Sequence, residues 1–499
     1  MDTGAGVAMS GRRIAIVGAG AAGLCMAIRL RDAGFSDVVV YERSDGVGGT
    51  WRANTYPGAA CDIPSHLYSF SFALRPDWSR RFAGQAEILE YFEDLCDAYG
   101  LRPLLRTGTE VHSARFDDAE GTWTLTLGDG RTDTVDAVVF AVGQLNRPFV
   151  PDLAGLSDFE GDVFHSARWD HRVDLAGKRV GVVGNGASAI QFVPPVAEVA
   201  SSLTVFQRSA NWILPKPDRP YGRLRRRAFA AVPILARLHR SAIYWRFEAN
   251  HLLLRRSSTL SERLGRLLSR RLRPLSDRGV AREAVVPDYP LGCKRVLLSN
   301  DYYQCLTRPD VRVELQHLTR VLPGGVETAD GVLHPLDVLI FGTGFAATEF
   351  LAPMSVFGRG GRDLNEVWAG GASAHLGMTV HGFPNMFILY GPNTNLGHNS
   401  ILFMIEAQTR YVAGAIARLR DDDLASLEVR ADVADRFAAE IRRGLDRTVW
   451  GAGCESWYKN DQGVITNNWP SFTVSYWARL RSRRPWEFVA RPRRVEVRT

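Results

Sequence analysis

The 499-residue sequence has few cysteines, and their spacing suits neither a dithiol nor a metal site. No Cys-x-x-Cys pair occurs, and no histidine stands at zinc-ligand spacing from a cysteine. This pattern argues against a disulfide scaffold, a structural zinc site and a dithiol reductase. We therefore expect reduced, mostly buried thiols and no bound metal, which is typical of a cytoplasmic protein. The six cysteines are Cys25, Cys61, Cys96, Cys293, Cys305 and Cys454.

Long apolar runs are also missing. No stretch reaches the length of about 18 apolar residues that a membrane-spanning helix requires. The opening segment, MDTGAGVAMS, lacks the charged and apolar regions of a secretory signal peptide. Hydrophobic residues make up 45% and charged residues 23% of the chain, the balance of a globular protein with a large core. We therefore expect a multidomain cytoplasmic protein without a transmembrane helix.

Positive charge is in excess only locally. The chain has 61 lysines and arginines against 54 aspartates and glutamates, a formal net charge of +7. The segment 221–275 alone holds 14 arginines but only two acidic residues, Glu248 and Glu262. No aromatic stacking platform accompanies these arginines, so we exclude nucleic acid as a partner. Leucines recur among them at near-helical spacing, which fits either a solvated helical cap packed on the neighbouring domain or peripheral contact with an anionic membrane.

A strand–turn–helix–strand pattern opens the chain. The apolar run 14–17 is typical of a buried parallel strand, and the turn Gly18-Ala-Gly20-Ala-Ala-Gly23 leads from it into an amphipathic helix. The first glycine makes the turn, the second lets the backbone approach a pyrophosphate, and the third lets helix and strand pack closely. The pattern therefore predicts a dinucleotide site, although a glycine-rich turn alone can also be without function.

Glu42 ends the second strand of this unit. A carboxylate at that place accepts hydrogen bonds from ribose hydroxyls, which favours an adenosine without a 2′-phosphate. Because strand, turn, helix, strand and acid follow in the required order, we interpret the unit as an FAD site.

The same pattern returns at Gly184-Asn-Gly186-Ala-Ser188-Ala189, after another apolar strand. Alanine replaces the third glycine, and only the packing distance depends on that position. After the second strand of this copy, Arg208 stands where an acid would otherwise be. A guanidinium suits a 2′-phosphate, so we predict NADPH here, with a merely surface-exposed arginine as the alternative.

The duplicated unit predicts an α/β protein with two Rossmann-like dinucleotide-binding domains and a helical insertion. We expect the FAD-binding domain to comprise residues 1–145 and 331–499, the latter with a C-terminal loop. The NADP-binding domain would comprise residues 146–215 and 286–330. The insertion would occupy residues 216–285, whose start is a proline-rich linker.

Two further segments are informative about the family. Residues 48–62 read GGTWRANTYPGAACD, and residues 159–170 read FEGDVFHSARWD. Together with the paired units, they resemble the fingerprints of type I Baeyer–Villiger monooxygenases, which belong to the class B flavoprotein monooxygenases. The resemblance extends from Arg12 to about Trp477. The positions that carry it include Gly49, Thr50, Trp51, Asp62, Gly161, His165 and Trp169.

The resemblance implies a catalytic pair. In the loop 288–295, DYPLGCKR, Arg295 corresponds to the family's catalytic arginine, and Lys294 to a residue that assists 2′-phosphate recognition. Asp62 corresponds to the carboxylate that pairs with this arginine. On the residues alone, Asp62 also fits a turn and Arg295 a surface phosphate clamp, so these alternatives stay open.

Other positions receive roles from the same resemblance. Gly342-Thr343-Gly344 resembles a segment beneath the flavin, and Trp457 a residue on a mobile loop that reaches NADP and substrate. We interpret His165 as a structural residue that couples the two domains rather than as a proton carrier. The predicted cofactor-binding residues are Gly18, Gly20, Gly23, Glu42, Gly49, Thr50, Trp51, Asp62, Gly184, Gly186, Ser188, Arg208, Lys294, Thr343 and Gly344. The predicted motif and coupling residues are Gly161, His165, Trp169 and Trp457.

The resemblance implies an NADPH- and O₂-dependent monooxygenase. NADPH would reduce FAD, the reduced flavin would hold O₂ as a peroxide, and attack on a ketone would give a tetrahedral adduct and then an ester or lactone. A fixed cation at Arg295 would lower the pKa of that peroxide and stabilise the oxyanion. Two alternatives remain, an N- or S-oxygenating monooxygenase, which needs no cationic clamp, and an FAD-binding redox sensor without turnover. The sequence leaves the ketone and the oligomeric state open.

Overall fold

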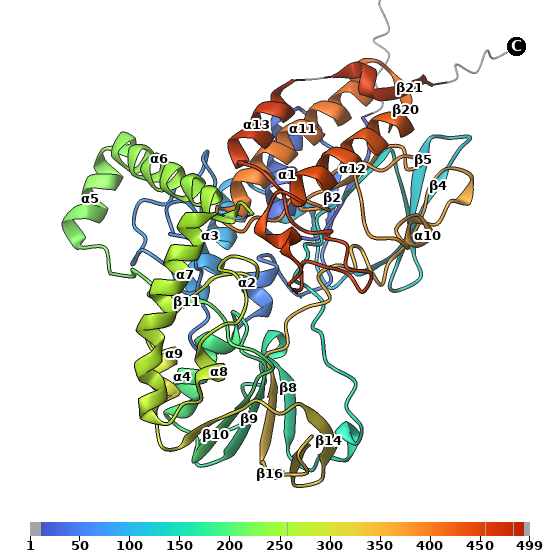
Figure 1. Cartoon of the computed structure of the whole chain (residues 1–499). Helices are drawn as coiled ribbons and strands as arrows, with labels where there is room; N and C mark the ends of the chain where they lie inside the picture. Colours follow the sequence, from blue (N-terminus) through green and yellow to red (C-terminus); the bar gives the residue numbers. More distant parts are fainter. Residues whose placement is uncertain (1–10, 257, 455, 483, 494–499) are drawn as a thin grey trace, which may run out of the picture.

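The computed structural model describes residues 11–256, 258–454, 456–482 and 484–493. They form two lobes, each built on a five-stranded parallel sheet, with a helical projection on one side (Figure 1). A four-stranded mixed sheet and a two-stranded antiparallel sheet complete the first lobe, and a three-stranded antiparallel sheet lies beside the second. The predicted α/β class with two Rossmann-like sheets is confirmed.

The first sheet has the order β19-β7-β1-β2-β3. Residues 14, 16, 38 and 40 lie on the face that packs against helices, while residues 15, 17, 39 and 41 face a mixed four-stranded sheet. Since both faces are covered, these strands are continuous apolar runs, as predicted. The strands are β1 (Ile14–Val17), β2 (Val38–Tyr41), β3 (Leu105–Arg106), β7 (Ala137–Phe140) and β19 (Met386–Ile388). The covering elements are helices α1 (Ala21–Asp32) and α11 (Ile401–Asp421) and strands β4 (Val111–Asp117), β5 (Thr122–Leu127), β6 (Thr132–Val135) and β18 (Ser355–Phe357).

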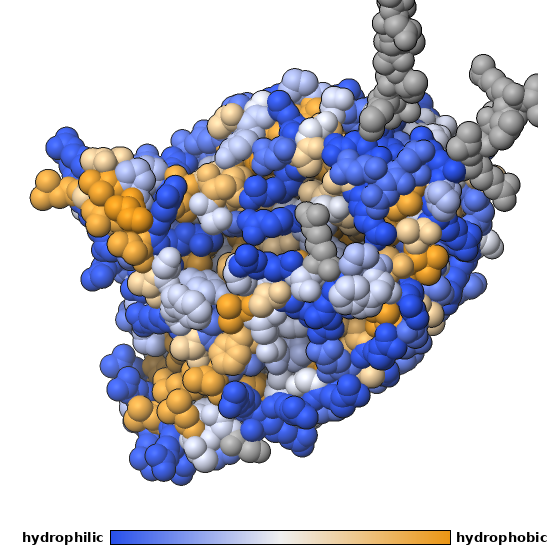
Figure 2. Space-filling model, turned by 90° about the horizontal axis from the view of Figure 1, so that it is seen from above, coloured by the Kyte–Doolittle hydropathy of each residue, from blue (hydrophilic) through white to orange (hydrophobic). Residues whose placement is uncertain are grey.

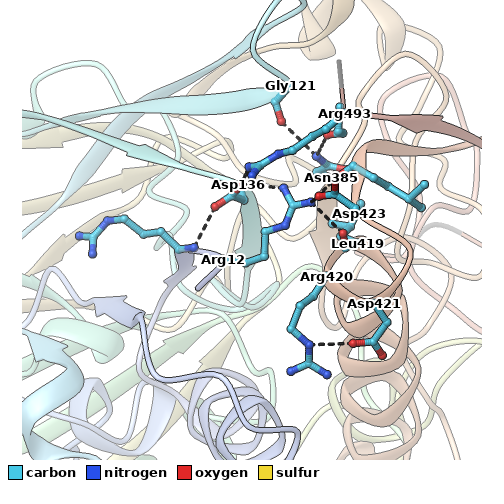
Figure 3. A network of polar contacts seen from close by, with 12 residues as sticks. Arg12, Gly121, Asp136, Asn385, Leu419, Arg420, Asp421, Asp423 and Arg493 are labelled. Carbon is cyan, nitrogen blue, oxygen red and sulfur yellow. Dashed lines mark hydrogen bonds and ion pairs between the residues drawn. The ribbon is translucent and has the colours of Figure 1, made fainter. Parts of the chain in front are cut away.

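A buried arginine fastens the C-terminal part of the chain to the first strand (Figure 3). Arg12 donates from Nη1 to Asp136 Oδ1 at 2.9 Å, and from Nη2 to the carbonyl oxygens of Leu419 and Leu424 at 2.8 and 2.7 Å. Arg493 donates to the same oxygen of Asp136 at 2.5 Å. Because Arg12 is only 6% exposed, its charge has to be satisfied within the protein. The first lobe is therefore assembled from two distant parts of the chain.

The second sheet has the order β13-β10-β9-β17-β8 and lies at the bottom of Figure 1. Strand β17, residues 338–341, pairs with β9 and β8 of this sheet rather than with the first sheet. The domain boundary expected at residue 331 is therefore too early in the chain. This apolar run looks like β7 in sequence, so its composition alone does not assign it to a sheet. The strands are β8 (Asp162–His165), β9 (Arg179–Val183), β10 (Ser202–Phe206), β13 (Val311–Glu314) and β17 (Val338–Phe341). Beside them lie β14 (Leu318–Leu322), β15 (Gly325–Thr328), β16 (Leu333–Pro335), α4 (Ala189–Ala197) and α9 (Tyr302–Cys305).

The insertion contacts both lobes, not only the second one. Ile243 and Tyr244 of α6 pack against Leu67 and Phe403 of the first lobe, whereas residues 284–285 of α8 belong to the core of the second. Helices α5 and α6 project from the body (Figure 1). The helices of the insertion are α5 (Arg223–Ala231), α6 (Pro233–Ala249), α7 (Thr259–Leu272) and α8 (Arg282–Val285).

The other helices and strands complete the first lobe and the links between lobes. They are α2 (Thr50–Ala53), α3 (Gln85–Ala98), β11 (Ile213–Leu214), β12 (Leu297–Leu298), α10 (Leu364–Val367), β20 (Leu424–Val429), α12 (Ala431–Leu445), α13 (Thr473–Arg481) and β21 (Phe488–Pro492). Within the described ranges, none of the helices is long and apolar enough to cross a membrane.

Candidate active site

A cavity of about 2200 Å³ is lined by residues of both lobes. Its volume exceeds the roughly 300–1,000 Å³ of a site for one small ligand, so more than one ligand fits. The predicted residues that line it are Gly18, Gly20, Glu42, Gly49, Thr50, Trp51, Asp62, Gly184, Gly186, Ser188, Arg208, Lys294, Arg295, Thr343, Gly344 and Trp457. The predicted residues outside its lining are Gly23, Gly161, His165 and Trp169.

The first glycine-rich turn brings backbone to the cavity wall. Gly23 makes this geometry possible, because a Cβ atom there would stand 1.8 Å from the carbonyl oxygen of Gly18. A Cβ atom on Gly20 would meet Gly49 Cα at 3.6 Å, so the two glycine-containing segments pass close to each other beside the cavity. An exposed backbone at the start of a helix suits a pyrophosphate, and the turn therefore fits FAD.

Glu42 stands at the end of β2 with a fixed, 8% exposed carboxylate. Its Oε2 accepts from the Ala19 N–H at 2.8 Å, and its Oε1 accepts from the N–H and the hydroxyl of Ser44, both at 2.8 Å. A carboxylate has about four acceptor positions, so one remains for a ribose hydroxyl. The geometry fits an adenosine ribose without a 2′-phosphate.

The second turn presents open space and positive charge. A Cβ atom on Gly186 would have just one neighbour within 4 Å, the Gly342 carbonyl oxygen at 3.9 Å. The backbone of Gly186 is therefore directly accessible from the cavity. Arg208 is exposed after β10, and Lys294 Nζ lies 3.2 Å from the hydroxyl of the adjacent Ser209. Two cations at one corner of the cavity suit a 2′-phosphate, which fits NADP.

Arg295 and Asp62 form an ion pair at the cavity wall. Arg295 donates from Nε and Nη2 to Asp62 Oδ2 at 3.2 and 2.5 Å, and Nη1 takes no part in this pair. Burial alone would raise the pKa of Asp62, but the guanidinium outweighs burial and holds that pKa below its usual range. The charge of Asp62 in turn raises the pKa of Arg295, so the pair is ionised at neutral pH. The arginine keeps 31% of its side chain exposed towards the cavity.

Three further groups lie beside this pair, and sequence reasoning assigned none of them a role there. Burial raises the pKa of Tyr458 to about 12, against the opposing charge of Arg295, and it likewise raises the pKa of Tyr390. Both phenols are therefore neutral near the guanidinium. Burial lowers the pKa of Lys216, and the nearby Asp62 carboxylate opposes that effect. These electrostatic interactions join residues far apart in the chain, so no spacing signal could have revealed them.

A disulfide links the loop of Arg295 to the loop of Trp457. Cys293, next to Lys294, is bonded to Cys454, with Cα atoms 6.4 Å apart. The expectation of reduced thiols is therefore wrong for these two cysteines, which lie 161 residues apart in sequence. Trp457 lines the cavity, and its ring centroid lies 4.4 Å from that of Tyr458. The remaining cysteines, all buried thiols, are Cys25, Cys61, Cys96 and Cys305.

The chain passes from one lobe to the other near residues 149 and 344, and these two segments lie side by side. Phe149 N–H donates to the Gly344 carbonyl at 2.9 Å, and the Thr343 hydroxyl donates to the Phe149 carbonyl. Gly344 thus follows the second sheet and lies at the crossing. The His165 ring, at the end of β8, stands edge-on to Phe345 at 5.9 Å. Burial lowers the pKa of His165 to about 4, so the ring is neutral at pH 7.

The other two motif positions are packing residues outside the cavity. Trp169 packs its ring against Phe164 at 5.1 Å and against Phe192 at 5.4 Å. A Cβ atom on Gly161 would stand 2.2 Å from the Asp337 carbonyl oxygen, so glycine is required where β8 enters the sheet.

Gln191 of α4 joins the second lobe to the segment that precedes Asp62. Its Oε1 accepts from the Tyr56 hydroxyl at 3.0 Å, and its Nε2 donates to the Ala60 carbonyl at 3.0 Å. A Cβ atom on Gly58 would stand 2.6 Å from the Gln191 carbonyl oxygen, which explains the glycine of this motif. The sequence predicted the motif but not its partner.

Comparison with known proteins agrees with this geometry. The model of the flavin-binding monooxygenase-like family matches residues 11–223. A Baeyer–Villiger monooxygenase of Pseudomonas aeruginosa is 43% identical, over 94% of this chain and 89% of its own length. The solved structure of an oxidized steroid monooxygenase bound to NADP has a TM-score of 0.84 at 30% identity, over 97% of this chain and 100% of that one. A structure of OTEMO in complex with FAD and NADP has a TM-score of 0.85 at 28% identity, over 96% and 99%.

Proposed function

The chain belongs to the Baeyer–Villiger monooxygenases, and we propose that Arg295 and Asp62 are the pair that carries out its oxygen insertion. The protein is an FAD-dependent enzyme that uses NADPH and O₂ to insert one oxygen atom next to a ketone carbonyl, giving an ester or lactone. The redox-sensor alternative is therefore wrong. The observation that carries the site proposal is the ion pair in the wall of a cavity that both glycine-rich turns also line.

The cofactors divide between the two turns. The residues proposed to hold FAD are Gly18, Gly20, Glu42, Gly49, Thr50 and Trp51, and those proposed to hold NADP are Gly184, Gly186, Ser188, Arg208 and Lys294. When bound, the two cofactors would supply the reducing equivalents and the redox chemistry that activates O₂. The open space before Gly186 and the fixed carboxylate of Glu42 support this division.

Arg295 offers a hydrogen-bond donor to the oxygen atom that becomes negative at the reacting carbonyl. Since Nε and Nη2 are engaged by Asp62, Nη1 is the group that we assign to this role. Arginine stays protonated even when it is partly buried, so the positive charge is permanent. Asp62 fixes the plane of the guanidinium and offsets its loss of hydration.

The division into domains follows the sheets. We propose that residues 12–145 and 345–493 form the FAD-binding domain, and that residues 146–215 and 286–344 form the NADP-binding domain. The pairing of β17 in the second sheet supports the later boundary. We also propose a cytoplasmic location, which the four free thiols fit and the single disulfide does not, since disulfides are rare in that compartment. Small ketones and O₂ remain the proposed substrates.

Replacing Arg295 with alanine tests the catalytic assignment. Reduction of the flavin by NADPH should stay near the wild-type rate, because the NADP-binding residues are untouched. Ester formation should fall by about 10²–10³-fold, the usual effect of removing one oxyanion donor. Flavin content and thermal unfolding provide the control for folding. Ketone turnover within about tenfold of wild type would overturn the proposal.

A further inference from the structure

Helices α5 and α6 expose large apolar side chains on the projection that they form. Figure 2 shows hydrophobic residues gathered on the part of the molecule that projects furthest to the left. The exposed apolar residues of this segment are Leu224, Val232, Ile234, Leu235, Leu238 and Trp245, with exposed fractions from 41% (Leu235) to 82% (Leu224). Exposed apolar side chains that stand singly are ordinary on a protein surface, whereas six of them gather on this one projection.

The apolar face of α6 points outward although the helix is firmly docked. Ile234, Leu238 and Trp245 recur at intervals that place them along one face of the helix. The opposite face is buried in the first lobe, where the Tyr244 hydroxyl lies 2.9 Å from the Thr473 hydroxyl. Arg240, also on the inner side, is 13% exposed and lies 3.6 Å from Glu406. The outward-facing apolar side chains are therefore not needed to hold the helix against the first lobe.

The charge around this face has one sign. Residues 219–247 contain no aspartate and no glutamate. The exposed arginines of the same segment are Arg219, Arg223, Arg227, Arg237 and Arg246. A partner therefore has to offer negative charge next to an apolar layer.

We propose that this surface, made of the exposed leucines, isoleucine, valine, tryptophan and arginines of α5 and α6, docks on an anionic lipid membrane. Anionic headgroups attract the arginines, and the acyl layer beneath accepts Leu238 and Trp245. A second copy of this chain would place arginine against arginine without an acidic group between them. The contact is peripheral, since no helix of the described part of the chain is suited to span a bilayer. It goes beyond the oxygenation reaction and does not depend on Arg295.

Vesicle co-sedimentation of the full-length holoenzyme tests the docking. Binding to vesicles of phosphatidylglycerol and phosphatidylcholine should exceed binding to pure phosphatidylcholine by about tenfold or more. High salt should weaken it, because screening shortens the reach of exposed charges. Equal binding to both kinds of vesicle, or none to either, would overturn the proposal.

Two pairs of matched variants localise the contact. Leu238→Ser/Trp245→Ser should abolish sedimentation, while Leu333→Ser/Trp486→Ser, at positions 54% and 66% exposed elsewhere on the surface, should not. Arg223→Gln/Arg227→Gln should weaken binding, while Arg442→Gln/Arg443→Gln on α12 should not, although each pair removes the same charge. All four variants should retain NADPH oxidation in solution, which shows that they fold.

Two results of this series would contradict the proposal. One is equal sedimentation of the α5–α6 variants and their controls. The other is a dimer in light scattering that Leu238→Ser/Trp245→Ser turns into a monomer, without vesicle binding, since the occupant would then be a second copy of the chain.

Discussion

The two dinucleotide-binding turns of this protein share one backbone plan but differ in the charge that follows their second strand. The first ends on Glu42, whose carboxylate is fixed by the Ala19 N–H at 2.8 Å. The second is followed by Arg208, with Lys294 bonded to the adjacent Ser209 at 3.2 Å. One architecture is thus fitted to two nucleotides by the charged residues that follow the second strand, while the first two glycines of each turn serve both sites alike.

The turns also differ in how helix and strand approach each other. In the first lobe Gly23 is indispensable, because a Cβ atom would stand 1.8 Å from the Gly18 oxygen. The second lobe has Ala189 at this position, and Gly342, directly after the neighbouring strand β17, leaves room for its methyl group. A Cβ atom on Gly342 would lie 3.1 Å from the Cβ atom of Ala189, so the two departures from the expected pattern complement each other.

The largest effect is expected from Gly23→Ala. The clash with Gly18 should lower the free energy of unfolding by about 3 kcal/mol and reduce the FAD content, because the turn is displaced from its strand. The flavin-to-protein ratio and thermal unfolding measure both effects. Ala189→Gly in the second lobe is the control and should leave FAD content unchanged. Full FAD occupancy in Gly23→Ala would refute this packing argument.

Arg208→Ala should weaken NADPH binding at the second site and leave FAD binding at the first site unchanged. Losing a charge-assisted contact to the 2′-phosphate, worth about 1.5–3 kcal/mol, should raise the KM for NADPH by roughly ten- to hundredfold. The KM for NADH and the FAD content should change little. Arg43→Ala, at the corresponding edge of the first site, is the control. If Arg208→Ala leaves the preference for NADPH over NADH intact, the 2′-phosphate is recognised elsewhere.

Gly342→Ala should destabilise the second lobe by about 1–2 kcal/mol, since its new methyl group crowds Ala189. In the double variant Gly342→Ala/Ala189→Gly, much of that loss should be regained. Urea unfolding of the single and double variants measures the coupling between the positions. Additive losses would show that the two residues do not compensate for each other.

Loss of the disulfide between Cys293 and Cys454 is expected to have the smallest effect. Thiol titration of the unfolded, unreduced protein should find four free cysteines, and Cys454→Ser should expose a fifth by releasing Cys293. NADPH oxidation should change only slightly, because both glycine-rich turns stay intact. Six free thiols in the wild-type protein would contradict the disulfide between Cys293 and Cys454.

Local patterns predicted the strands and glycine-rich turns, because a parallel strand buried on both faces is a continuous apolar run whatever surrounds it. The charges at Glu42 and Arg208 were predictable for the same reason, since they stand within two residues of the end of such runs. The sheet that contains residues 338–341 was not, because β7 and β17 carry the same kind of run. The contacts of Gln191 with Tyr56 and the bond between Cys293 and Cys454 depend on how distant segments meet.

We expect Arg295 and Asp62 to act as one unit where the two nucleotide-binding lobes meet. A double-mutant cycle on the ratio of ester to H₂O₂ formed per NADPH tests it most directly. Asp62→Asn should lower this ratio by about tenfold in the wild-type background and should have no further effect once Arg295 is alanine. Independent, multiplicative losses from the two substitutions would contradict it.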